Sequence, residues 1–174
     1  MFHAILTGML KEKEIISIRD LLNERNLTIP PYQRPYRWSV SSVNTLFTDI
    51  LDAMKKMYDL HLINYEYRLG TVVLHEDKDK NGALKLNIVD GQQRLTTLIL
   101  LLRCLGLGEN EMPAPEYSKL SINNLLRNYN ILKAAVNSLE DKNKYRDFIL
   151  NNCTMVKIVI TEQEEAFADR ILMA

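Results

Sequence analysis

Residues 88–98, Ile-Val-Asp-Gly-Gln-Gln-Arg-Leu-Thr-Thr-Leu, join a strand-like segment to a helix-like one. The preceding residues, 84–89, are mostly apolar and end in two β-branched side chains, which is typical of a strand. The apolar residues that follow recur at the spacing of one helix face: Leu95, Leu98, Ile99 and Leu102. Asp90 is a favoured N-cap residue and Gly91 permits a tight turn, so we predict a strand, a corner and a buried helix.

The head of this helix is a candidate anion site. First-turn amides have no acceptor within the helix, and together with the helix dipole they attract phosphate. Arg94 would add a two-pronged contact to phosphate oxygens, and Gln92 and Gln93 would donate hydrogen bonds without adding charge. The same residue types also fit an ordinary corner with a solvated arginine. A polar Gln-Gln-Arg head on an otherwise apolar helix favours the specific contact.

Length and composition indicate an ordinary globular domain. The 174 residues suffice for one domain with its own core. The 22 basic and 22 acidic residues give a net charge of zero, which argues against a broadly basic nucleic-acid-binding surface and leaves room for a local patch. The two cysteines match no metal spacing and the three histidines form no cluster, so no metal site is predicted.

No targeting segment is evident in the sequence. The longest apolar run, residues 98–102, is too short to cross a bilayer. Residues 1–10 lack the basic and long apolar regions of a secretory signal. We therefore predict a cytoplasmic protein without a membrane partner.

A second unusual stretch, residues 31–38, reads Pro-Tyr-Gln-Arg-Pro-Tyr-Arg-Trp. This mixture of aromatic residues and arginines on a proline-stiffened loop suits stacking on bases and pairing with phosphates. It equally suits a rigid loop whose rings cap the core while its arginines face solvent; for Trp38 we favour packing. A later basic cluster, Lys142, Lys144 and Arg146 with Tyr145, indicates a solvated helix face, with contact to a nucleic-acid backbone as the weaker alternative.

The rest of the pattern alternates short strands and helices. We predict helix starts at Ser17, with Asp20 three residues on, and at Ser39 or Ser41. Strand 69–74, a charged turn over 76–82 that ends in Asn-Gly, and strand 84–89 predict a hairpin. The remaining predicted elements are strands 27–29 and 154–160 and helices 118–139, 141–151 and 162–172.

Three segments, residues 29–38, 69–74 and 88–98, together resemble the N-terminal domain of GmrSD-type restriction proteins. Those proteins are NTP-dependent systems that cleave modified foreign DNA. Residues 153–168 fit the same pattern. The domain is similar in turn to the ParB and sulfiredoxin fold, because Gly91-Gln92-Gln93-Arg94 matches a Gly-x-x-Arg helix start. The resemblance implies a single α+β domain over residues 1–174, with a small mixed sheet and a hairpin surrounded by helices.

The resemblance also implies a function and a site. The function is a nucleoside triphosphatase, acting on GTP or ATP with Mg²⁺, whose hydrolysis licenses DNA cleavage by a separate nuclease domain or subunit. The implied catalytic residues are Asp90, Gln93 and Arg94. The implied nucleotide-binding residues are Gly91, Gln92, Gln93, Arg94 and Thr96, with Tyr32, Gln33 and Arg34. The implied pocket for DNA or a modified base comprises Tyr32, Gln33, Arg34, Tyr36, Arg37 and Trp38.

The chain departs from the family pattern after its last predicted helix. Relatives continue into a Phe-Glu-x-Leu-Asn segment and usually a His-containing nuclease domain, whereas this chain ends at Ala174. We therefore expect a domain truncated before a helical or nuclease region, with no nuclease site of its own. The alternatives are a non-enzymatic DNA-binding or regulatory ParB-like module and a scaffold whose apolar surface promotes a homodimer.

Overall fold

Five strands form one mixed sheet in the computed structural model, which describes residues 10–30 and 32–161. The strand order is β1-β5-β3-β4-β2. Pairing is antiparallel for β1 with β5 and for β3 with β4, and parallel for β3 with β5 and for β2 with β4. The strands are β1 (Leu10–Ser17), β2 (Leu27–Thr28), β3 (Tyr67–Lys78), β4 (Leu84–Asp90) and β5 (Cys153–Ile160).

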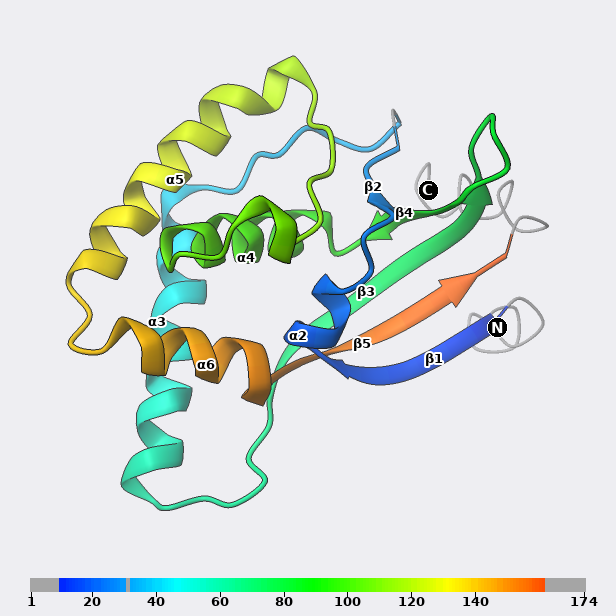
Figure 1. Cartoon of the computed structure of the whole chain (residues 1–174). Coiled ribbons are helices and arrows are strands. Elements are labelled where there is room, and N and C mark those ends of the chain that lie inside the picture. Colours follow the sequence, from blue (N-terminus) through cyan, green and yellow to red (C-terminus); the bar gives the residue numbers. More distant parts are fainter. Residues whose placement is uncertain (1–9, 31, 162–174) are drawn as a thin grey trace.

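The helices gather on one side of the sheet, and the β3–β4 hairpin reaches away from them (Figure 1). They are α2 (Ile18–Leu22), α3 (Val40–Asp59), α4 (Gln92–Cys104), α5 (Ile122–Asn137) and α6 (Lys142–Asn152), with 3₁₀ turns at Glu109–Glu111 and Lys119–Ser121. The predicted α+β class, with a mixed sheet and a hairpin, is confirmed. The ParB and sulfiredoxin likeness stays a prediction. No helix in the described part of the chain is both long and apolar enough to span a membrane.

Two predicted helix starts are confirmed by their capping bonds. The Ser17 hydroxyl accepts a hydrogen bond from the Asp20 amide at the start of α2. The Ser39 hydroxyl accepts one from the Ser42 amide at the start of α3, which selects Ser39 over Ser41. A serine in this position satisfies a first-turn amide that the helix itself leaves without an acceptor.

Several predicted boundaries are wrong. β3 runs to Lys78, because Glu76 and Asp77 pair with β4 rather than forming the turn. The turn itself is held by the Asp79 carboxylate, which accepts hydrogen bonds from the Asn81 and Ala83 amides. β2 ends at Thr28, and the helix predicted over 118–139 begins at Ile122 after a 3₁₀ turn. The helix predicted over 162–172 lies outside the described residues.

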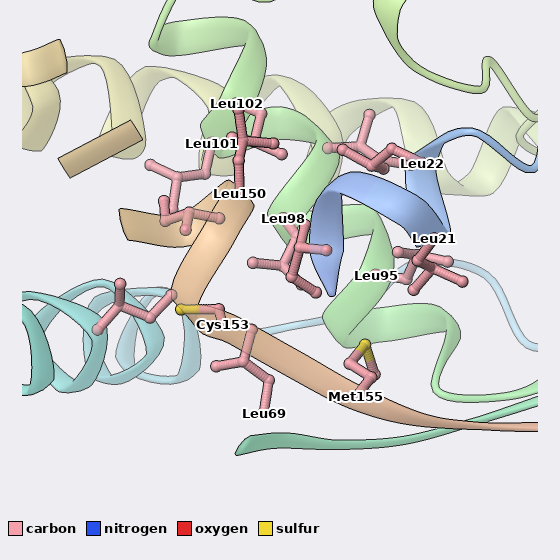
Figure 2. Close-up of a cluster of buried hydrophobic side chains, with 14 of the residues drawn as sticks. Leu21, Leu22, Leu69, Leu95, Leu98, Leu101, Leu102, Leu150, Cys153 and Met155 are labelled. Atoms are coloured by element: carbon pink, nitrogen blue, oxygen red, sulfur yellow. The ribbon is translucent and has the colours of Figure 1, made fainter. Parts of the chain in front are cut away.

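Helix α4 occupies the centre of the hydrophobic core (Figure 2). Leu95, Leu98, Leu101 and Leu102 have no exposed surface. Figure 2 shows these side chains among leucines of α2 and α6 and residues of β3 and β5. A helix buried on several sides is fixed in orientation by packing, so the core aligns α4 and holds its N-terminus in place at the end of β4.

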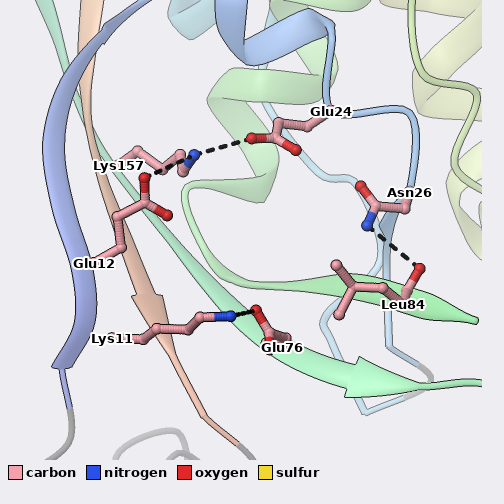
Figure 3. A network of polar contacts seen from close by, with 7 residues as sticks. All are labelled: Lys11, Glu12, Glu24, Asn26, Glu76, Leu84 and Lys157. Carbon is pink, nitrogen blue, oxygen red and sulfur yellow. Dashed lines mark hydrogen bonds and ion pairs between the residues drawn. The ribbon is translucent and has the colours of Figure 1, made fainter.

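A single lysine links three carboxylates beside the sheet, and Figure 3 shows two of them, those of Glu12 and Glu24. Lys157 of β5 is buried, with 4% of its surface exposed, and its Nζ lies 3.6, 3.0 and 2.9 Å from carboxylate oxygens of Glu12, Glu14 and Glu24. Burial lowers the pKa of Lys157, but hydrogen bonds to Glu24 and Glu14 outweigh it, so the net pKa is raised. The network ties β1 and the turn that follows α2 to β5.

Replacing Lys157 by methionine is expected to lower the free energy of unfolding by about 1.5–3 kcal/mol, the range for lost hydrogen bonds to charged groups. The effect stays moderate because the three glutamates are partly exposed and regain water. Lys11→Met is the matched control, since it removes only the exposed pair with Glu76 and should cost less than about 1 kcal/mol. Equal losses in urea denaturation would contradict a structural role for the Lys157 network.

Candidate functional site

Gly91 closes the corner between β4 and α4. Its φ is +90°, and a Cβ at this position would lie 2.8 Å from the Thr71 carbonyl oxygen of β3. Only glycine therefore allows both the left-handed conformation and the close approach to β3. The predicted N-cap role of Asp90 is wrong, because Gly91 occupies the cap position without a side-chain bond and Asp90 is the exposed last residue of β4.

The two stretches singled out in the sequence meet in one cavity of about 530 Å³. From the loop it is lined by Tyr32, Gln33, Arg34 and Trp38, and from the corner by Val89, Asp90, Gly91, Gln92, Gln93 and Arg94. This volume lies within the usual range for small-molecule pockets of about 300–1,000 Å³. Trp38 combines the two roles considered for it, because it lines the cavity and packs against the core.

Polar groups without partners face this cavity. Gln92 is 5% exposed, and its side-chain amide has no hydrogen bond to any described residue. Arg94 is half-buried and Arg34 is exposed, and neither guanidinium forms an ion pair or hydrogen bond within the described chain. Among the described residues the buried side-chain atoms without a hydrogen-bond partner belong to His75, so the Gln92 and Arg94 head groups are reached by solvent in the cavity. They are therefore available to an acceptor from outside the chain.

Gln93 and Gln33 hold the loop against the corner. The Gln93 amide donates to the Pro35 carbonyl oxygen at 3.2 Å and accepts from the Arg37 amide at 2.8 Å. The Gln33 amide donates to the Val89 carbonyl oxygen at 3.1 Å. Both the oxygen and the nitrogen of the Gln93 side-chain amide are therefore engaged in holding the loop, and its catalytic role stays a prediction.

Tyr36 and Thr96, both predicted for the site, lie in the core instead. Tyr36 is fully buried, and its hydroxyl shares a 2.8 Å hydrogen bond with Thr97 and accepts one from Asn128. Burial raises the pKa of Tyr36, against smaller opposing effects of these two hydrogen bonds. Thr96 is 2% exposed and accepts a hydrogen bond from the Tyr117 hydroxyl. Arg37 is exposed but does not line the cavity.

Helix α5 supplies supporting residues that the sequence did not reveal. Asn124 donates to the Tyr36 carbonyl oxygen, and Asn128 and Arg127 donate to the Trp38 carbonyl oxygen. The Ser121 hydroxyl accepts from the Tyr36 amide. These asparagines are about 90 residues from the loop in the sequence, and no local pattern links the two. Their role in supporting the loop could therefore not be predicted. The loop's backbone polar groups are thus satisfied by side chains rather than by a neighbouring strand.

The basic cluster predicted over residues 142–146 lies in the first turns of α6, and its tyrosine points into the core. Tyr145 is fully buried and donates a hydrogen bond to the Phe47 carbonyl oxygen. The Lys144 ammonium lies 3.6 Å from the centre of the Tyr58 ring, and Lys142 donates to Asn137. Lys142 is exposed and Lys144 and Arg146 are partly exposed, as expected for a solvated helix face.

Replacing Gln93 by alanine is expected to lower the free energy of unfolding by about 1–3 kcal/mol, because two hydrogen bonds of about 1 kcal/mol each are lost and the Arg37 amide loses its acceptor. Gln92→Ala is the matched control: it breaks no hydrogen bond to a described residue and should change stability by less than about 1 kcal/mol. The denaturation midpoints of the two variants in urea measure the difference, and the reverse order would contradict these assignments.

Fold and cavity together define a class of small α+β domain in which a strand-to-helix corner and an arginine-containing loop share one pocket. The sequence profile of the GmrSD restriction endonuclease, N-terminal domain, matches residues 18–171. The chain belongs to this family of restriction-system domains, as the resemblance indicated. A comparison with curated proteins found no match.

Proposed function

We propose that this domain binds and hydrolyses a nucleoside triphosphate, GTP or ATP, as the sensor of a restriction system against modified foreign DNA. Cleavage would be carried out by a separate nuclease domain or subunit. One observation carries the proposal: the unpaired Gln92 amide and the unpaired Arg94 guanidinium lie beside the N-terminus of α4 in one cavity. Helix amides, an amide side chain and an arginine are the groups that bind phosphate oxygens.

The cavity offers distinct contacts for the two parts of a nucleotide. Arg94 and the α4 amides would bind the phosphates, and Arg34 would add a second positive charge at the exposed side. The rings of Tyr32 and Trp38 line the loop side and would stack on the base. Phosphoryl transfer mainly requires positioning and stabilisation of charge, and these residues supply both.

Asp90 would bind a magnesium ion in the same cavity. No group of three or more His, Cys, Asp or Glu residues that would enclose a metal ion occurs in the described ranges. Mg²⁺ is commonly bound by only one or two carboxylates together with substrate phosphates, so such a group is not required. Asp90 is exposed at the cavity and would hold the ion or orient the attacking water. The bound ion would neutralise charge on the phosphates.

Thermal unfolding with and without GTP or ATP, each with Mg²⁺, tests binding directly. A ligand that binds only the native state stabilises it by about 2.7 kcal/mol at 100 times its Kd, so the melting temperature should rise with concentration. Phosphate release by the same samples tests turnover. An unchanged melting temperature at millimolar concentrations of both nucleotides would reject the proposal, and binding without phosphate release would reject hydrolysis by this chain.

A non-enzymatic DNA-binding module is the second candidate. It is favoured by the exposure of Tyr32, Arg34 and Arg37 on one loop. Binding through the DNA backbone would weaken steeply with salt, and Arg34→Ala and Arg37→Ala would reduce it while Arg94→Ala would not. Ligand binding that depends on Arg94 but not on Arg37, which lies outside the cavity, supports the nucleotide proposal.

A further inference from the structure

Gly70 of β3 lies against the side chain of Arg94. Its φ is +126°, and a Cβ built on it would overlap the Arg94 guanidinium. The atoms in conflict belong to the functional end of the arginine, not to its aliphatic stem. The absence of a side chain at position 70 therefore makes room for that end.

A bulge in the sheet creates this space. The register between β3 and β5 shifts between Arg68 and Thr71, which pair with Thr154 and Val156. Three steps along β3 thus match two along β5, and Gly70 falls within the extra length. Bulges bend a strand locally, and a glycine in one often marks a close approach of another group. Here the approaching group is a side chain from the first turn of α4.

The structure places the Arg94 guanidinium in the space beside Gly70. Its guanidinium forms no ion pair or hydrogen bond with a described residue. Burial, followed by Asp49, raises the pKa of the Tyr67 hydroxyl, and Arg94 opposes this with a smaller electrostatic effect. A long side chain without a bonded partner keeps one orientation only where the surrounding surface restricts it. At Gly70 the missing side chain leaves the space that this orientation of Arg94 occupies.

We propose that Gly70 is a positioning residue, which holds the Arg94 guanidinium at the cavity so that it meets an anionic phosphate in a preset orientation. The inference deepens the proposed nucleotide function and rests on it. Any side chain at position 70 displaces the guanidinium from this place. Affinity for phosphate-containing ligands then falls although Arg94 itself is unchanged.

A double-mutant cycle with Gly70→Ala and Arg94→Ala tests the proposal, read out by titration with GTP, ATP and tripolyphosphate. Gly70→Ala alone should weaken binding about tenfold, and should change it by less than about twofold in the Arg94→Ala background. The backbone strain of an alanine at +126° is present in both backgrounds and cancels in the cycle. Gly106→Ala is the matched control, since Gly106 has φ +95° and open space around its missing Cβ, and it should leave affinity unchanged.

Stability measured on the same four proteins gives a second readout. Gly70→Ala should lower the melting temperature more when Arg94 is present than when it is absent, because only then does the added methyl group meet the guanidinium. Equal weakening of binding by Gly70→Ala in both backgrounds, or none in either, would overturn the proposal. If tripolyphosphate binds but GTP and ATP do not, the nucleotide function is rejected. The effect of Gly70→Ala can then still be measured with tripolyphosphate. If no probe binds, the nucleotide function fails and the melting temperatures decide whether Gly70 makes room for Arg94.

Discussion

Replacing Arg94 by alanine is expected to weaken nucleotide binding by about 10- to 100-fold, and to abolish phosphate release. The loss corresponds to the contribution of about 1.5–3 kcal/mol made by hydrogen bonds to charged groups. Since the Arg94 guanidinium has no ion pair or hydrogen bond within the described chain, its removal should cost little stability. The affinity is measured by titration calorimetry with GTP or ATP and Mg²⁺.

Two further variants separate charge from geometry at this position. Arg94→Lys keeps the charge but cannot make a two-pronged contact with a phosphate, so it should bind nucleotide between alanine and the wild type. Arg103→Ala removes an exposed arginine from the other end of the same helix, outside the cavity, and should bind as the wild type does. Equal affinity for Arg94→Ala and the wild type would show that the phosphates bind elsewhere.

The sequence predicted the elements whose signals are local. The Ser17 and Ser39 caps, the hairpin and the α4 leucines depend on residues a few positions apart, and each of these is confirmed. The stretch at 88–98 also correctly predicted a strand, a corner and a buried helix. What it assigned wrongly was the cap, because Asp90 and Gly91 both suit that position by residue type. The contact of Gly91 with Thr71 decides between them, and that contact exists only in the folded sheet.

The candidate site was harder to predict because its residues act over long separations. Gln92 and Gln93 are adjacent and chemically identical, yet one faces the cavity without a partner and the other binds the loop backbone. Tyr36 resembles Tyr32 in the sequence but turns into the core toward Thr97. Gly70 gave no local signal of its relation to Arg94, which depends on a register shift between two strands. The residue types of the two stretches indicated where the site lies. The packing of the folded chain decided which of their side chains face the cavity.

Gly91 is the position at which a small substitution should damage the fold most. An alanine there is expected to lower the free energy of unfolding by about 3–5 kcal/mol. Of this, about 1–2 kcal/mol comes from the left-handed conformation that φ +90° imposes. The rest comes from the added Cβ, which would lie 2.8 Å from the Thr71 carbonyl oxygen and 3.3 Å from Val72 Cα. Both atoms belong to the backbone of a central strand, so neither can move aside without disturbing the sheet.

Gly82→Ala is the matched control for this prediction. Gly82 has φ +79° in the exposed hairpin turn, and a Cβ there would meet nothing within 4 Å. It should therefore cost only the conformational part, about 1–2 kcal/mol. Urea denaturation of both variants measures the difference, and equal losses would show that α4 can retreat from β3 at no cost. Because a retreat would also move the α4 amides and Arg94 away from the loop, the Gly91 variant should lose nucleotide affinity while the Gly82 variant keeps it.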